Sequence, residues 1–237
     1  MTHAFDRALR ALASTEDVPD GDLSRPFCEV LRFDGVSVST FGALVASETI
    51  SASDDVSSRI DEIQFDLTEG PCWTALSTGA PVLEEDLVTR PGHHWPAFTE
   101  AVREHPVRAV FAFPIVFGPF PLGAVDVYSP APATLAPEQV RQAVSLATAA
   151  GRRVLRRALR SLEDDDVLAD RSPFSRRVVH QATGVVLAQL DVSPDDAYLL
   201  IQGHAFARRT TMRQVAEEIL DGSVRFEKHG GLIEEAR

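Results

Sequence analysis

Helix start and stop signals recur along residues 176–226, and they constrain the fold more than any other part of the chain. Ser193 followed by Pro194 is typical of a helix start, because the serine side chain can cap a free backbone N–H and proline has no N–H to leave unpaired. Thr211 opens the pattern Thr-Met-Arg-Gln, which fits a capping box, and Gly222 fits a helix end. The segment is therefore predicted to form three short helices joined by short turns.

Apolar residues in this segment are spaced for helices that pack together. After Thr211 they follow the i, i+3, i+4, i+7, i+8 pattern of one buried face, with Met212, Val215, Ala216, Ile219 and Leu220. The first helix contains Gly184, and a glycine in a helix interior costs about 1 kcal/mol relative to alanine. We therefore expect Gly184 to permit close approach of a neighbouring helix near Ala197 or Ala216.

Segment 173–226 resembles the ANTAR domain, a small RNA-binding module of three helices in bacterial transcription antitermination regulators. The matching residues are Ala182-Thr183-Gly184, Ala197-Tyr198, Ile201-Gln202, Ala205 and Val215-Ala216. Thr183 stands where the family pattern has lysine, and Gln202 stands where it has arginine. The resemblance implies an all-α domain that binds paired stem-loops overlapping a transcription terminator.

RNA binding by this chain has to be local, because its net charge is −12 and a polyanion is repelled at long range. The candidate RNA-binding residues are Arg176, Arg177, His180, Thr183, Gln202, His204, Arg208, Arg209 and Arg213. Acidic residues interrupt this set, so specificity is expected to come from shape and exposed loop bases. The alternative is that the arginines at helix ends are surface residues that compensate the helix dipole.

Alternating apolar residues predict a mixed structure for the first part of the chain. Strands are expected at 36–41, 49–53, 80–83, 107–117 and 122–128, and helices soon after Met1 and at 23–33, 55–65 and 95–104. Gly70 and Pro71 are expected to lead into a further helix. Within 107–117 one face is predicted to hold Phe111, Phe113, Ile115 and Phe117, and the other Val110, Ala112 and Val116.

This order of elements resembles a GAF domain, with Glu69-Gly70-Pro71-Cys72 entering a helix, Phe113-Pro114 in a central strand and Leu122-Gly123 after it. The resemblance implies an α+β sensor domain, an antiparallel sheet with helices on both faces and a pocket for a small molecule. The cyclic-nucleotide signature is absent, so the ligand is unknown. Candidate ligand-binding residues are Phe41, Cys72, Trp73, Trp95, Phe113 and Asp126, although aromatics at such spacing are usually core, and Asp126 either contacts ligand or faces solvent.

The sequence gives only weak signals for a redox, metal or catalytic site. Cys72 at a helix start fits a redox or haem-linked sensor, but Glu69 opposes a thiolate and a structural cysteine is commoner. His93 and His94, with Glu85 and Asp86 upstream, have metal-ligand side chains, yet a polar loop fits them better than a metal site. No motif of nucleophilic or phosphate-transfer catalysis is present, and the phosphorylation residues of a receiver domain cannot be placed. The chain is predicted not to be an enzyme.

Residues 137–163 are predicted to form one long connecting helix with two apolar stripes. One contains Val140, Val144, Ala147, Gly151, Val154 and Ala158, and the other Leu155, Leu159 and Leu162. One stripe is expected to pack on the sheet and the other to meet a second chain in a homodimer. The expected domains are an N-terminal helical segment (1–22), a GAF domain with the long helix (23–160), an acidic linker (161–172), an ANTAR domain (173–226) and a tail (227–237).

The two cysteines are far apart in the sequence and no signal peptide precedes them, which favours a cytoplasmic protein. No apolar run is long enough for a membrane-spanning helix, so no association with a membrane is expected. The sequence predicts a regulator that binds structured RNA and senses an unknown small ligand. Two alternatives stay open. A DNA-binding regulator is suggested by the pattern at 211–216, which resembles the first helix of a helix-turn-helix. A ligand-binding or interaction protein whose ANTAR domain no longer binds RNA is suggested by Thr183 and Gln202.

Overall fold

The computed structural model describes residues 2–13, 22–41, 47–89, 94–163, 176–229 and 232–236. The chain divides into two compact units, Met1–Phe174 and Ser175–Arg237. Most of the predicted acidic linker lies outside the described residues, as do His93 and much of the predicted N-terminal segment.

The first unit is built on a five-stranded antiparallel sheet. Its strands are β1 (Gly35–Thr40), β2 (Glu48–Ala52), β3 (Val82–Glu84), β4 (Ala109–Phe117) and β5 (Phe120–Ser129), in the order β2-β1-β5-β4-β3. β3 pairs only with β4 residues 110–112. Pro114 therefore lies beyond this pairing, where its missing N–H removes no bond to β3.

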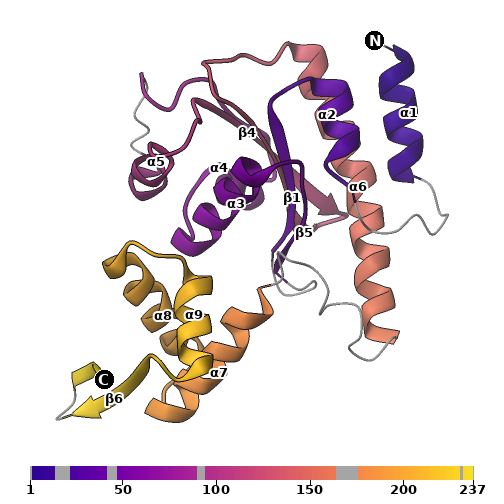
Figure 1. Ribbon diagram of the computed structural model, residues 1–237. Helices are drawn as coiled ribbons and strands as arrows, with labels where there is room; N and C mark the ends of the chain where they lie inside the picture. The colour runs from indigo at the N-terminus through magenta and orange to yellow at the C-terminus, as the bar shows by residue number, and fades with distance from the viewer. Residues whose placement is uncertain are drawn as a thin grey trace. The chain divides into compact units, whose positions relative to one another are not determined.

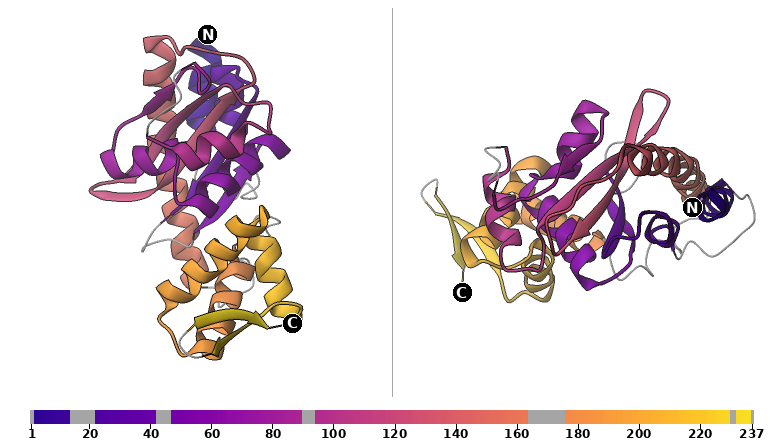
Figure 2. Two further views of the ribbon diagram at one scale, coloured as in Figure 1. Left: turned by 90° about the vertical axis from the view of Figure 1, so that its left-hand side faces the viewer. Right: turned by 90° about the horizontal axis from the view of Figure 1, so that it is seen from above.

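Helices cover both faces of this sheet (Figures 1 and 2). On one side lie α1 (Thr2–Ala13), α2 (Arg25–Leu31) and α6 (Pro137–Glu163), and on the other α3 (Asp55–Leu67), α4 (Pro71–Thr78) and α5 (Pro96–Val102). Strand residues alternate between two cores: Val36, Val38, Phe111, Phe113, Val125 and Val127 pack with α2 and α6, whereas Val110 and Tyr128 pack with α3 and α5. The predicted α+β architecture is confirmed.

The long helix α6 has the predicted bounds, and its buried face contains most of the first predicted stripe. Ala143, Leu146, Ala147, Ala150 and Val154 are buried at helical spacing, while Val144 is 40% exposed. Leu155 packs against the same core. Of the predicted stripe, Val140, Ala147 and Val154 therefore pack in the core as expected, and Val144 does not. The side chains of Ala158, Leu159 and Leu162 lie outside the described ones.

Phe117 does not share the buried face of β4 as predicted. The pairing of β4 with β5 shifts in register between Ile115 and Val116. Phe117 pairs with Phe120 at the hairpin end of β4, where Val116 is exposed as well. Phe117 is 44% exposed, whereas Ile115 is fully buried.

The second unit contains the three predicted helices, α7 (Arg177–Leu190), α8 (Pro194–Arg208) and α9 (Met212–Asp221). Ser193 accepts a bond from the Asp196 N–H, and Thr211 forms the predicted capping box with Gln214. Gly222 ends α9 in the left-handed conformation with φ of 84°. The helices share one core of Val179, Ala182, Val186, Leu190, Ala197, Ile201, Ala205, Met212, Val215, Ala216 and Ile219.

One expectation for this unit is wrong, and one segment has structure that was not predicted. Gly184 is exposed, and a Cβ added there would meet no atom within 4 Å, so no helix approaches it closely. The predicted tail contains a hairpin of β6 (Arg225–His229) and β7 (Leu232–Ala236). Val224 and Phe226 belong to the helical core, which holds the start of the hairpin against the helices.

Candidate functional site

Phe41 and Trp73, two of the predicted ligand-binding residues, lie in an aromatic cluster with Phe65. The ring centroids are 4.9 Å apart for Phe41 and Trp73, and 6.1 Å apart for Phe41 and Phe65. Trp95 reaches α4 through its Nε1–H, which donates to Thr74 Oγ1 at 2.9 Å. These contacts tie α3, α4 and the start of α5 together under one face of the sheet.

Phe113 lies on the opposite face of the sheet from this aromatic cluster. It is fully buried in the core formed with α2 and α6. Successive residues of a strand point to opposite faces, so its position in β4 decides this. The prediction that Phe113 lines the same pocket as the other five residues is therefore wrong.

Gln64 of α3 connects the two remaining candidates, Cys72 and Asp126. Its Nε2–H donates to Asp126 Oδ2 at 2.9 Å, and its Oε1 accepts the Cys72 backbone N–H at 2.8 Å. Its backbone carbonyl also accepts the Trp73 Nε1–H at 2.7 Å. Gln64 is not among the residues predicted from the sequence, and Gly70 is the sequence feature related to it. A Cβ at Gly70 would lie 2.6 Å from Gln64 Cγ.

Asp126 and Asp61 are buried carboxyl groups on this side of the sheet, with exposed fractions of 4% and 0%. Asp61 accepts bonds from Ser39 Oγ at 2.6 Å and from the Thr49 hydroxyl. Burial raises the pKa of Asp126 well above its usual value, and the charge of Asp61 raises this pKa further. The alternative that Asp126 faces solvent is wrong.

One oxygen of Asp126 and the neighbouring Ser37 hydroxyl are not satisfied. Ser37 pairs with Asp126 across β1 and β5. Within the described residues, Ser37 Oγ and Asp126 Oδ1 are buried and have no hydrogen-bond partner. The two atoms belong to paired residues of neighbouring strands, and a bound water or a ligand hydroxyl would supply the hydrogen bonds that they lack.

Cys72 and Glu69 have structural contacts in this structure. The Cys72 side chain has no exposed surface. Glu69 Oε1 accepts the backbone N–H groups of Ala97 at 2.8 Å and Phe98 at 3.1 Å, so it caps the start of α5. A fully buried thiol is screened from oxidants, which favours the structural alternative for Cys72.

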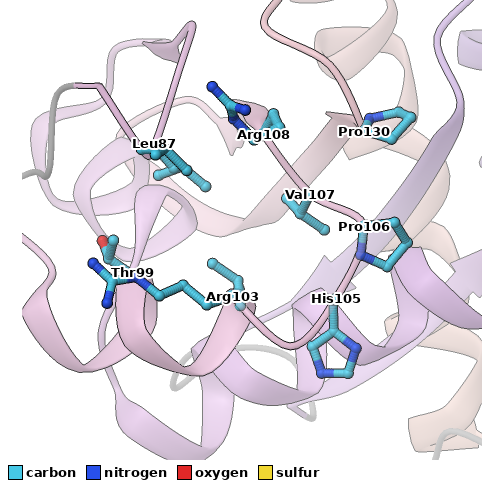
Figure 3. A pocket seen from close by; sticks show the side chains of 10 residues that line it. Leu87, Thr99, Arg103, His105, Pro106, Val107, Arg108 and Pro130 are labelled. Atoms are coloured by element: carbon cyan, nitrogen blue, oxygen red, sulfur yellow. The ribbon is translucent and has the colours of Figure 1, made fainter.

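A cavity of about 250 Å³ lies elsewhere, at the end of α5 and the start of β4 (Figure 3). Its walls are Leu87, Val88, Thr99, Val102, Arg103, His105, Pro106, Val107, Arg108 and Pro130, and none of these is a predicted ligand residue. Burial lowers the pKa of His105, and the charge of Arg59 lowers it further. The sequence patterns gave no signal for this cavity because its walls come together only through the fold.

Asp86, named above as a possible metal ligand, binds an arginine beside this cavity. Both Asp86 oxygens accept from Arg108, at 2.8 and 2.9 Å from Nη2. The hydrogen bond from Thr89 and the contacts with Arg108 lower the pKa of Asp86 to about 2. Across the described residues, no group of three or more His, Cys, Asp or Glu side chains is placed to hold a metal ion.

The predicted RNA-binding residues of the second unit fall into two groups. The first surrounds the start of α7. Arg176 is only 7% exposed, and His180 is at the surface. Desolvation by its neighbours lowers the pKa of His180, and the charge of Arg176 lowers it further, so His180 adds little positive charge at neutral pH. Thr183 bonds back to the Val179 carbonyl at 2.8 Å.

The second group lies along α8 and the turn into α9. Arg208 binds both carboxylate oxygens of Glu218 and contacts His204 at 3.3 Å, so its charge is already paired. Arg209 occupies the left-handed turn after α8 with φ of 52° and is exposed. Within the described part of the chain it has no ion-pair partner. Gln202, on α8, and Arg213, in the first turn of α9, are half-buried.

The fold and these residues define a two-domain protein of the sensor-regulator class. The GAF domain family matches residues 21–154, and the ANTAR domain family matches residues 173–220. The GAF match covers more than half of the 237 residues, so the chain belongs to the GAF domain family and also carries an ANTAR domain. The family resemblances noted in the sequence are confirmed.

Solved structures similar to this chain include GAF domains. One, from a Coxiella burnetii phosphoenolpyruvate-protein phosphotransferase, is 16% identical with a TM-score of 0.50, over 68% of this chain and 98% of that one. A GAF domain from an Acinetobacter phosphoenolpyruvate-protein phosphotransferase is 10% identical with a TM-score of 0.49, over 70% and 96%.

A third similar structure is the chromophore-binding domain of a bacteriophytochrome from R. palustris. It is 17% identical with a TM-score of 0.48, over 67% of this chain and 62% of that one, so the chain spans less than two thirds of its length. A comparison with curated proteins gives no match. Among the described residues, no helix has the length and apolar character needed to cross a bilayer.

Proposed function

We propose that this protein is a non-enzymatic cytoplasmic regulator that binds structured RNA through its ANTAR domain. The observation that carries this proposal is the ANTAR match at 173–220, together with exposed basic residues where α8 turns into α9. As the family resemblance implies, the RNA would be tandem stem-loops that overlap a transcription terminator. Binding would let the polymerase read on.

Only some of the candidate residues suit a phosphate contact. Arg209 is exposed without an ion-pair partner in the described residues, and Arg213 begins α9 beside it in the sequence. Arg208 is held by Glu218, and Arg176 is buried. We therefore assign the phosphate contacts to Arg209 and Arg213, and leave Arg208 to position the α8–α9 turn.

Removing these two charges tests the proposal. In a gel shift at fixed salt, the wild type is expected to bind a tandem stem-loop RNA more tightly than a duplex DNA of the same length. The variant with Arg209→Ala and Arg213→Ala is expected to bind the RNA at least tenfold more weakly, because it loses two contacts with phosphates. Its affinity is also expected to depend less steeply on salt concentration. Arg152→Ala removes an exposed charge from α6 and serves as the control. Preference for duplex DNA would instead support the DNA-binding alternative.

A helix-turn-helix needs a recognition helix after the helix that resembles its first one, which here is α9. The described residues that follow α9 form the β6–β7 hairpin rather than a helix. Absence of binding to either nucleic acid would support the third alternative, an interaction protein that no longer binds RNA.

The sensing part of the proposal rests on the GAF match and on the unsatisfied polar atoms of Ser37 and Asp126. A small ligand with a hydroxyl or amide group would satisfy them. The ligand is expected to shift the population between a state that masks the RNA surface and one that exposes it. Mass spectrometry of the purified protein under native conditions tests for a ligand that stays bound.

A homodimer is also part of the proposal, because two RNA-binding domains would fit two stem-loops. The exposed Val144 on α6 suits a contact with a second chain. Sedimentation velocity at micromolar concentration is expected to show a dimer, and Val144→Glu is expected to shift it toward a monomer. A wild type that sediments as a monomer contradicts this part of the proposal.

A further inference from the structure

Helix α8 presents an apolar surface that the helical core does not use. Phe206 is 67% exposed, the highest value among the large apolar side chains of the described residues, and Leu199 is 58% exposed. They are seven residues apart, which places them on the same face two turns from each other. The residues of α8 that are buried in the core are Ala197, Ile201 and Ala205.

Gly203 lies between these two side chains on the same face. It is exposed, and a Cβ added there would find no atom within 4 Å. The face therefore has an aromatic ring at one end, a leucine at the other and bare helix backbone between them. A flat group can approach the backbone at Gly203 while its face contacts the Phe206 ring.

The charge of this unit argues for a contact of this kind. Between residues 176 and 237 acidic side chains are about as numerous as basic ones, so non-specific attraction of phosphates is weak. Thr183 and Gln202 add no charge. A module that binds RNA with few cations has to gain affinity from unpaired bases, and stacking on an aromatic side chain is the usual way.

A cation lies at the phenylalanine end of the face. Arg209 follows Phe206 by three residues, is exposed and has no ion-pair partner in the described residues. A base stacked on Phe206 would bring the phosphate of the same or the next nucleotide toward Arg209. The neighbouring Arg208 is occupied by Glu218 and does not compete.

We propose that Phe206 stacks on an unpaired base of the RNA loop, with Gly203 and Leu199 forming the floor beneath that nucleotide and Arg209 binding its phosphate. The inference rests on the proposed function, because it assigns a role within RNA binding. In this proposal Phe206 gives the protein its preference for RNA with a loop over fully paired RNA.

The test compares Phe206→Ala, Phe206→Trp and wild type in the full chain, with a stem-loop RNA and a fully paired RNA of the same length. Loss of one base stack corresponds to roughly 5- to 150-fold weaker binding. Phe206→Ala is expected to weaken stem-loop binding within that range and to leave the salt dependence unchanged, whereas Arg209→Ala reduces the salt dependence. Phe206→Trp is expected to keep affinity and to show fluorescence quenching on binding beyond that of the wild type.

Phe120→Ala is the matched control, because Phe120 is an exposed phenylalanine of the first unit at 50%. It is expected to bind RNA as the wild type does. If the wild type binds the stem-loop and Phe206→Ala binds it equally well, the stacking proposal is overturned while the proposed function stands. A wild type that binds neither RNA overturns both. If Phe206→Ala lowers the sedimentation coefficient without RNA, the face belongs to a contact between two chains, and the stacking proposal is again overturned.

Discussion

The environment of Asp126 disfavours a charge on its carboxyl group. Asp126 lies in the central strand β5, it has a second carboxyl group nearby in Asp61, and its partner Gln64 offers one neutral amide N–H. Burial disfavours the ionised form, and the charge of Asp61 disfavours it further. Folding therefore favours the protonated acid, and the protein binds a proton at Asp126 more tightly when folded than when unfolded.

The sign of the pH dependence follows from this raised pKa. Above the unfolded value near 3.8, the unfolded chain loses the Asp126 proton while the folded chain keeps it. The contribution of Asp126 to stability is therefore largest at low pH and falls as the pH rises toward the folded pKa. Asp126→Asn removes this titration and keeps an oxygen for Gln64. We expect the variant to gain stability relative to the wild type as the pH rises from 5 to 8, measured as the difference in urea unfolding midpoints.

Asp61→Asn is the contrasting variant for this measurement. Asp61 accepts hydrogen bonds from two buried hydroxyl groups, on Ser39 and Thr49. An amide N–H would face one of those hydroxyls in place of an acceptor, so the free energy of unfolding is expected to fall by about 1–3 kcal/mol. Equal pH responses for the wild type and Asp126→Asn would contradict the raised pKa of Asp126.

Gly70 has a backbone conformation and a neighbour that both exclude a side chain. Its φ is 140°, and a Cβ would lie 2.6 Å from Gln64 Cγ. Gly70→Ala is expected to lower the free energy of unfolding by about 2–4 kcal/mol, combining backbone strain with displacement of Gln64. Gly79→Ala provides the control, because Gly79 has φ of 66° but no atom within 4 Å of a Cβ. It is expected to cost about 1–2 kcal/mol from the left-handed conformation alone. Thermal unfolding of both variants measures the difference, and equal losses would show that the Gln64 contact does not matter.

At the scale of elements, local chemistry made most helices predictable. The caps of α8 and α9 depend on residues three positions apart, and the long helix α6 depends on apolar spacing within itself. The bulge after Ile115 and the role of Gln64 depend on partners distant in the sequence; Gln64 and Asp126 are 62 residues apart. The hairpin after α9 was not predicted, although Gly230-Gly231 between two short segments is a sequence signal for a hairpin turn.

Gly184 does not have the packing role that its position in a helix suggested. The glycine in the predicted first helix suggested close helix packing, yet in α7 it is exposed and has open space around it. Gly184→Ala is therefore expected to raise the free energy of unfolding by about 0.5–1 kcal/mol, because alanine has the better helix propensity and meets no neighbour. Chemical denaturation measures the free energy of unfolding. Gly151→Ala is the contrasting variant and is expected to lower this free energy. A Cβ at Gly151 would lie 3.1 Å from Ile115 and from the Val116 carbonyl. Destabilisation by Gly184→Ala would restore the packing interpretation.

At the scale of the whole molecule, charge is divided unequally between the two units. Basic and acidic side chains nearly balance after residue 176, so almost all of the net charge of −12 belongs to the part of the chain before it. If the second unit binds RNA as proposed, the negative charge of the first unit would oppose that binding even without a contact. This repulsion and a direct occlusion of the RNA surface would be two different forms of restraint, and they would differ in how they respond to salt.

Removal of the residues before Pro173 tests which form of restraint operates. The remaining chain keeps the second compact unit, Ser175–Arg237, and its helical core. If the GAF domain masks the RNA surface, the shortened chain is expected to bind a tandem stem-loop RNA more tightly than the full chain at every salt concentration. If only charge repulsion operates, the difference disappears near 1 M salt, where the screening length is about 3 Å. Fluorescence anisotropy at 0.1 M and 1 M salt separates the two. Equal affinities of the two chains at low salt would show that the GAF domain does not restrain the ANTAR domain at all.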